Sequence, residues 1–226
     1  MLEVVYHCNP HQPHQVEHGH WLKAGLWRHG LELKITADCR RPADVHIVSG
    51  PHYAKGYWLD HPRTLLLDRA YYHEVKSGRW TSMDWVSLGW MLPDGGRRFS
   101  KGEGRPAPER KPIKTEGGRI FLADYNGTVL NDVDTVRLHP ANRHYDEPLL
   151  DVLARHRHAI GYMTTALVTA ALEGLTIDCR DRRNILAEPD WIELLPYADW
   201  HGDEISAGDA WEHLVHDIDT GYSTRS

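Results

Sequence analysis

The chain has 226 residues, of which 41% are hydrophobic, and it carries a formal net charge of −6 at neutral pH. The composition allows a packed core, and the length allows one large domain or two small ones. No apolar run approaches the roughly 18 residues of a membrane span, and the first residues do not resemble a signal peptide, so we expect a cytoplasmic protein with no membrane partner.

In the first half of the chain, short apolar runs alternate with helix-patterned segments. Turns containing Gly, Pro or His separate these runs. The expected strands are 2–7, 31–37, 44–49 and 64–68, and the expected helices are 16–29 and 52–59. Strands that alternate with helices at this spacing predict a parallel sheet covered by helices.

The α/β pattern weakens after residue 70 and disappears over residues 93–118. A strand is expected at 84–91, but Gly, Pro and charged residues dominate the stretch that follows it. Few of its side chains could enter a core, so we predict a linker over 93–118. This linker divides the chain into one domain of residues 1–118 and a second domain of residues 119–226.

A second α/β series follows the linker. Its expected strands are 120–125, 133–138, 158–161 and 176–179, and its expected helices are 148–156, 164–173, 190–195 and 207–217. The predicted fold class is therefore α/β, with two Rossmann-like parallel-sheet halves joined by a basic, Pro- and Gly-rich linker.

The segment HAIGYMTTALVTAALEGLTIDC, residues 158–179, reads as a compact strand–turn–helix–strand unit. Thr164 or Thr165 is a plausible N-cap, and Gly174 ends the helix. The free N–H groups at such a helix start attract anions, most often phosphate. The spacing fits an ordinary buried α/β helix equally well.

Histidines gather near the start of the chain, where five of the 17 lie between residues 7 and 20. His11, His14 and the neighbouring Glu17 could contribute to a metal site, although no HExxH motif is present. Alternatively, one of these histidines could act as a general base, because the pKa of imidazole lies near neutrality.

Other polar residues follow the expected strands, where open parallel sheets bind their ligands. Asp68 is a candidate base or binding residue, and the alternative is that it caps the next segment or pairs with Arg69. The remaining strand-end candidates are Gly50, His52, Tyr53, Asn126, Gly127 and His139.

Charge is distributed unevenly along the chain. Residues 76–119 hold ten Lys and Arg and five Asp and Glu, a local charge of +5, so the rest of the chain carries −11. A basic stretch with interleaved aromatics can follow a nucleic-acid backbone, with Arg97, Arg98 and Lys101 as phosphate contacts. A solvated loop would have the same composition.

Several of these segments resemble glycosyltransferases of the two-domain GT-B architecture. HWLKAGLWRHGLELKI at 20–35 is similar to their first helix and second strand, and DVHIVSGPHYA at 44–54 to the next strand and its ligand-edge loop. RLHP at 137–140 and GYMTTALVTAALEGL at 161–175 are similar to their donor domain. The GPHYA and LLLDRAYY segments also resemble short phage-encoded glycosyltransferases, some of them suspected of modifying DNA bases.

The resemblance implies the diphosphate and ribose contacts, and the strand-end, histidine and charge patterns supply the other candidates. The donor site would consist of His139, Gly161, Thr164, Thr165, Glu173, Asn126 and Gly127, with the threonines on the diphosphate and Glu173 on the ribose. The acceptor site would consist of Gly50, His52, Tyr53, Arg69, Arg97, Arg98 and Lys101. The catalytic base would be Asp68, His14 or His11, and no metal or other cofactor would be required.

We therefore expect a glycosyltransferase that moves a sugar from a nucleotide-sugar donor to an acceptor hydroxyl. A hydroxymethylated base in phage DNA is the sharper form of this hypothesis. The alternatives are a metal-dependent hydrolase that uses the His-rich first loop and a non-catalytic phage protein that binds nucleotide or DNA.

Overall fold

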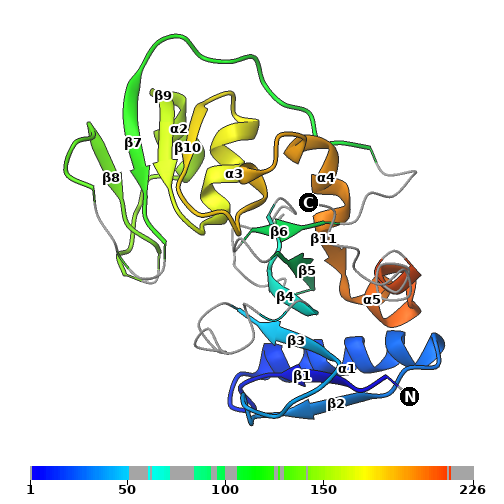
Figure 1. Ribbon diagram of the computed structural model, residues 1–226. Coiled ribbons are helices and arrows are strands. Elements are labelled where there is room, and N and C mark those ends of the chain that lie inside the picture. Colours follow the sequence, from blue (N-terminus) through cyan, green and yellow to red (C-terminus); the bar gives the residue numbers. More distant parts are fainter. Residues whose placement is uncertain are drawn as a thin grey trace. The chain divides into compact units, whose positions relative to one another are not determined.

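The computed structural model describes residues 2–50, 61, 63–71, 84–92, 96–99, 106–124, 127, 130–140, 142–212 and 214. The chain divides into two compact units (Figure 1), and the predicted α/β class with parallel-rich sheets is confirmed. Unit 1 comprises Met1–Arg105 and Tyr197–Ser226, and unit 2 comprises Pro106–Pro196. These bounds differ from the expected division at residue 118 in two ways: residues 106–118 belong to unit 2, and the chain returns to unit 1 at Tyr197.

Unit 1 is built on a sheet that has seven strands within the described residues. The strands are β1 (Val4–His7), β2 (Leu33–Thr36), β3 (Val45–Ser49), β4 (Thr64–Arg69), β5 (Trp85–Met91), β6 (Arg97–Arg98) and β11 (Asp199–His201). Their order is β11-β5-β4-β3-β1-β2, and β6 pairs with β5. Strands β1 to β4 are parallel to one another, as predicted.

The prediction of a wholly parallel sheet is wrong for unit 1, since β5 is antiparallel to β4, β6 and β11. The sequence of β5 is almost continuously apolar, and that pattern reports burial but not strand direction. Strand β6 lies inside the predicted linker. Its residue Arg97 is fully buried, so the charged composition of this stretch did not mean that all of its side chains face solvent.

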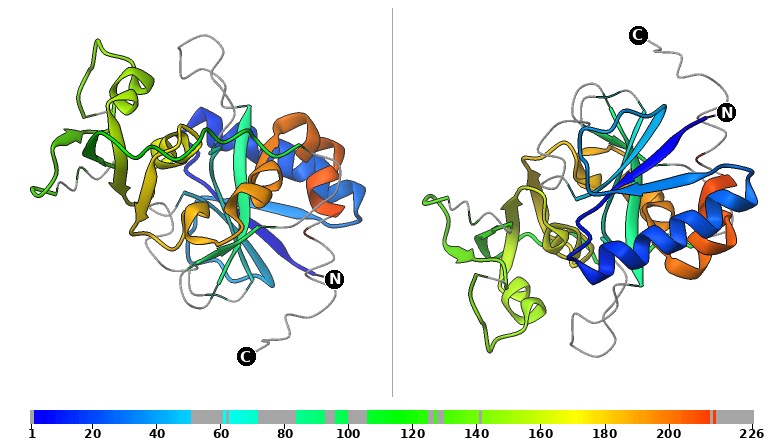
Figure 2. Two further views of the ribbon diagram at one scale, coloured as in Figure 1. Left: turned by 90° about the horizontal axis from the view of Figure 1, so that it is seen from above. Right: turned by 90° about the horizontal axis from the view of Figure 1, so that it is seen from below.

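Helix α1 (Pro13–Arg28) covers one face of the sheet, with Leu22 and Leu26 in the main core. It begins three residues before the expected start, because proline fits the first turn of a helix. The short helix α5 (Gly202–Ala207) lies beside it (Figure 2). A Cβ at Gly25 would lie 1.9 Å from the Ile205 carbonyl oxygen, so α1 and α5 can approach this closely only at a glycine.

Unit 2 holds a four-stranded parallel sheet with the order β10-β9-β7-β8. The strands are β7 (Gly118–Leu122), β8 (Thr135–Arg137), β9 (His156–Gly161) and β10 (Thr176–Cys179). The helical segments are α2 (Leu149–Ala154), α3 (Thr165–Leu172) and the 3-10 turn η1 (Ile185–Ala187). Helix α4 (Trp191–Ala198) begins in unit 2, and its last two residues belong to unit 1. This is a doubly wound strand order: β8 lies on one side of β7, whereas β9 and β10 lie on the other, so the order of strands reverses between β7 and β9.

Both faces of the unit 2 sheet are covered. Leu153 of α2 and Leu167 of α3 pack with Ile120 on one face, whereas Phe121 and Ile160 pack with loop residues on the other. None of the described helices is both long and apolar enough to cross a membrane.

Candidate functional site

The candidate donor site lies at the carboxyl ends of β7 and β9, between which the strand order reverses. Leu122 and Gly161 are paired neighbours at these two ends. A Cβ at Gly161 would lie 2.7 Å from the Leu122 carbonyl oxygen and 3.0 Å from Leu167 Cδ1. A glycine here therefore lets α3 begin close against β7.

Thr164 is the N-cap of α3, as expected, and its Oγ1 accepts a hydrogen bond from Ala166 N at 3.4 Å. The residue is only 8% exposed. Buried Asn184 donates from Nδ2 to the carbonyls of Tyr162 and Thr164, at 3.2 and 3.3 Å. Thr164 thus organises the turn, while half-buried Thr165 offers the more accessible hydroxyl at the helix start.

The role of Asn184 was not predicted from the sequence. It lies 20 residues beyond Thr164, in a loop without periodic pattern. Its only local signal is an Asn directly before η1, where its side chain also accepts a hydrogen bond from Leu186 N.

The turn after β7 lies at the same edge of the sheet. Gly127 has φ +70 and donates from its backbone N to the Asp124 carbonyl at 3.2 Å. This left-handed conformation explains why glycine occupies the position. The predicted donor contact Asn126 lies outside the described residues, and Asp124 adds a carboxylate at the strand end that the donor-site prediction did not include.

His139 also belongs to this edge. It follows β8, and its carbonyl accepts hydrogen bonds from the backbone N of Asn142 and Arg143 at 2.8 and 3.3 Å. Ala123 N donates to the Arg137 carbonyl at 2.9 Å, which joins the end of β8 to the end of β7. The structure therefore brings His139, the turn after β7 and the start of α3 to one edge of the sheet.

Glu173, the predicted ribose contact, lies at the other end of α3. Its Oε2 accepts a hydrogen bond from Lys111 Nζ at 2.6 Å. The segment around Lys111 also covers the end of the helix: Lys111 N donates to the Leu172 carbonyl and Lys114 N to the Gly174 carbonyl, both at 2.8 Å. These bonds satisfy carbonyls that a helix end leaves open. Glu173 is already engaged in an ion pair with Lys111.

In unit 1, the start of α1 and the end of β4 approach each other. Burial, and then the positive charge of Arg69, lower the pKa of His14. His14 is therefore neutral at pH 7, the state that a general base requires. Asp68 is half-buried, and its Oδ1 accepts a hydrogen bond from Arg69 N at 2.8 Å. His11 is exposed before the helix.

Four of the predicted acceptor contacts, Gly50, Arg69, Arg97 and Arg98, lie within the described residues of unit 1, at different places. Gly50 has φ +71 and donates from its N to the Leu67 carbonyl at 2.8 Å, so it forms a turn beside the end of β4. Arg98 is exposed on β6. The other predicted contacts, His52, Tyr53 and Lys101, lie outside the described residues.

Arg97 does not fit a surface contact to nucleic acid, because it is 0% exposed. Its Nη1 donates to Tyr71 Oη at 3.0 Å and its Nη2 to the Leu66 carbonyl at 2.8 Å. Its guanidinium carbon lies 4.8 Å from the centre of the Phe99 ring. Pairing of β6 with β5 places Arg97 on the sheet, where it holds β4 and β6 together.

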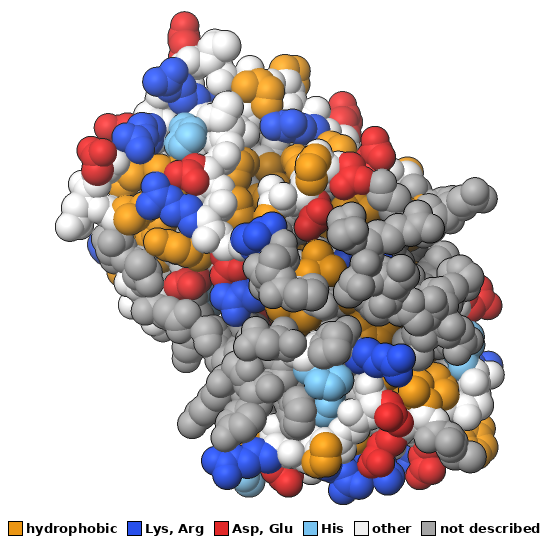
Figure 3. Space-filling view, in the orientation of Figure 1, with side chains coloured by type: hydrophobic (Ala, Val, Ile, Leu, Met, Phe, Trp, Pro, Cys, Tyr) orange, Lys and Arg blue, Asp and Glu red, His pale blue; other side chains and the backbone are white. Residues whose placement is uncertain are grey.

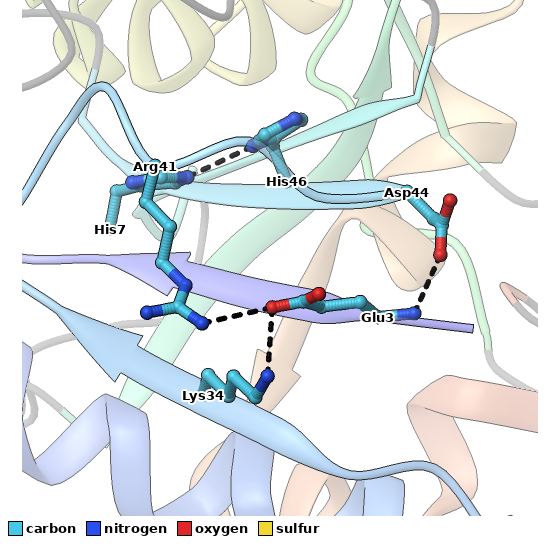
Figure 4. Close-up of polar contacts among 6 residues, drawn as sticks. All are labelled: Glu3, His7, Lys34, Arg41, Asp44 and His46. Atoms are coloured by element: carbon cyan, nitrogen blue, oxygen red, sulfur yellow. Dashed lines mark hydrogen bonds and ion pairs between the residues drawn. The ribbon is translucent and has the colours of Figure 1, made fainter. Parts of the chain in front are cut away.

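A buried histidine pair in unit 1 was not predicted (Figure 4). His7 Nε2 and His46 Nδ1 lie 2.9 Å apart, and His7 Nδ1 lies 3.1 Å from the Asp38 carbonyl oxygen. Since a carbonyl can only accept, His7 Nδ1 carries a hydrogen and His7 Nε2 accepts from His46. Burial, and then the neighbouring His61 and His7, lower the pKa of His46 to about 4.

Among the described residues, no three His, Cys, Asp or Glu side chains gather as metal ligands would. Comparisons with family models, with curated proteins and with solved structures gave no match. The functional inference therefore rests on the residues and their arrangement.

Proposed function

We propose that the protein is a glycosyltransferase in which unit 2 binds a nucleotide-sugar donor and unit 1 supplies the acceptor side. The observation that carries the proposal is the edge of unit 2 where Gly161, the capped turn and the start of α3 meet. Helix N–H groups at the reversal point of a doubly wound sheet favour an anionic ligand. A nucleoside diphosphate is such a ligand and is also the leaving group of sugar transfer.

In the proposed reaction, the acceptor oxygen attacks the anomeric carbon as the bond from that carbon to the diphosphate breaks. A base in unit 1, His14 or Asp68, takes the proton of the acceptor hydroxyl. The negative charge that develops on the diphosphate is stabilised by the N–H groups at the start of α3 and by His139. Neither step requires a metal ion.

A hydroxymethylated base in phage DNA is the acceptor that we propose. Among the described residues of the predicted acceptor set, Arg69 and Arg98 are exposed basic residues of unit 1. The base would be flipped out of the DNA stack, or otherwise exposed, to reach the site.

Thermal unfolding with a panel of nucleotides and nucleotide sugars, with and without EDTA, tests the donor assignment. A ligand at a hundredfold excess over its Kd stabilises the native state by about 2.7 kcal/mol. We expect stabilisation by one class of nucleoside diphosphate, independent of EDTA and weakened by Thr165→Val. Thr169→Val, the same change one turn further along α3, is the matched control.

Either of two results would contradict the proposal and favour one of its alternatives. Stabilisation by a divalent metal and by no nucleotide would favour the hydrolase that uses the His-rich first loop. Donor binding without sugar transfer to any hydroxymethylated DNA or small acceptor would favour a non-catalytic binding protein.

A further inference from the structure

Two arginines share one aromatic ring in the loop that follows β8. The guanidinium carbons of Arg137 and Arg143 lie 4.5 and 5.3 Å from the centre of the Tyr145 ring. Tyr145 Oη accepts a hydrogen bond from Leu138 N at 2.9 Å, so the ring is anchored to the strand end. The ring thus holds two positive charges near each other.

The carboxylates of this loop make their short contacts with other side chains, and the charge of Arg137 acts on Glu147 only through space. Glu147 Oε2 accepts from Arg155 Nη2 at 3.0 Å, and Asp146 lies 3.4 Å from His144 Nε2. Arg137 donates to a backbone oxygen, the Glu147 carbonyl, at 2.9 Å. Within the described residues, no ion pair includes Arg137 or Arg143. Two guanidinium groups held together without a paired carboxylate favour an oxyanion, which each can bind with two parallel N–H groups.

The position of the two arginines points to the same ligand edge as the start of α3. The Arg137 carbonyl is bonded to Ala123 N, directly after β7. The loop also lies against the turn after β7, because a Cβ at Gly127 would lie 3.6 Å from Asn142 Nδ2. The arginine pair therefore belongs to the edge of the sheet where the strand order reverses.

We propose that Arg137, Arg143 and Tyr145 form a subsite for the diphosphate of a nucleotide. This assignment rests on the proposed function and names the residues that would take its anionic ligand. A long polyanion fits less well, because Asp146 and Glu147 flank the arginines. Acidic and basic side chains are also interspersed on the face of unit 2 seen in Figure 3.

Isothermal titration with inorganic pyrophosphate and with a panel of nucleoside diphosphates tests the subsite. Loss of one charged hydrogen-bonding group corresponds to a roughly 10- to 100-fold weaker Kd, so we expect this loss for Arg143→Gln and a similar one for Arg137→Lys. Arg143 is exposed, so its replacement should leave the melting temperature unchanged. Arg157→Gln, at the start of β9 and so at the opposite edge of the sheet, is the charge-matched control.

The possible outcomes separate this subsite from the sugar transfer. Unchanged pyrophosphate affinity in both Arg143→Gln and Arg137→Lys, or an equal loss in Arg157→Gln, would overturn the subsite. Duplex DNA binding that depends on Arg143, without pyrophosphate binding, would also overturn it and favour a nucleic-acid contact. Pyrophosphate binding that depends on Arg143, in a protein that transfers no sugar, would support the subsite and contradict the proposed glycosyltransferase activity.

Discussion

Inside unit 1, His46 donates to His7 across 2.9 Å, because His7 already uses its other ring nitrogen on the Asp38 carbonyl. A proton added to His7 Nε2 would set two N–H groups against each other. Burial lowers the pKa of both imidazoles, so the folded protein favours the neutral form of each.

This pair should make the protein sensitive to acid. The folded-state pKa of each histidine lies below its unfolded value of 6.5, so their contribution is fully present above pH 6.5. It is lost as the pH falls toward 4, the approximate folded pKa of His46. The loss for His46 is at most about 3 kcal/mol, from 1.36 kcal/mol for each pKa unit.

Urea unfolding between pH 7 and pH 4.5 measures this loss. His46→Gln removes one titrating group and should flatten the pH dependence while lowering stability at pH 7. His20→Gln, on the exposed side of α1, serves as the control. An identical pH slope in His46→Gln and the unmodified protein would contradict the assignment.

The two glycines that follow α1 and α3 should differ in their tolerance of alanine. Both have positive φ, +72 at Gly30 and +84 at Gly174. A Cβ at Gly30 meets nothing within 4 Å, whereas one at Gly174 would lie 2.2 Å from the Pro112 carbonyl oxygen. We expect Gly30→Ala to cost about 1 kcal/mol and Gly174→Ala about 3 kcal/mol in unfolding free energy. Chemical denaturation checks the order, and equal costs would mean that the segment at Pro112 does not press on the helix end.

Replacement of Arg97 should affect stability rather than nucleic-acid affinity. Lysine lacks the planar fork that reaches both Tyr71 and the Leu66 carbonyl, so Arg97→Lys should cost roughly 2–4 kcal/mol. Arg98→Lys, next to it and exposed, should stay within about 0.5 kcal/mol. Denaturation curves of the two variants measure both losses of stability. A stable Arg97→Lys protein with reduced DNA affinity would restore the surface contact that the sequence suggested.

Arg69 should tune the protonation of His14. Because the positive charge of Arg69 contributes to lowering the His14 pKa, Arg69→Gln should raise that pKa toward its ordinary value. An NMR titration of the His14 ring measures the shift directly. Arg63→Gln is the control, since Arg63 lowers the pKa of His61 and should leave His14 unchanged. If His14 is the base, the acidic limb of the transfer rate should move upward with its pKa.

Local patterns predicted the strands and the capped turn well. The buried strands β3 and β4 lie within one residue of their expected bounds and β7 within three, and Thr164 caps α3 as its sequence suggested. These features depend on residues a few positions apart. Hydrophobic periodicity and capping chemistry act over that range.

Long-range partners were not predictable from one sequence. The Lys111–Glu173 ion pair spans 62 residues, and the His7–His46 contact spans 39. In each pair, the sequence around one residue gives no indication of the other. Strand β11, three residues long, carries no periodic pattern, and the sequence placed it in the second domain instead of in unit 1.

The return of the chain to unit 1 has a consequence for synthesis. Strand β11 pairs with β5 through Trp200 and Val86, and Ile205 meets α1 at Gly25. Until those last residues emerge from the ribosome, the edge of β5 is open and part of α1 is uncovered. Elongation at about 5–20 residues per second makes that interval roughly 5–20 s, during which unit 2 can fold first. Unit 1 thus begins to be made before unit 2 and is completed after it.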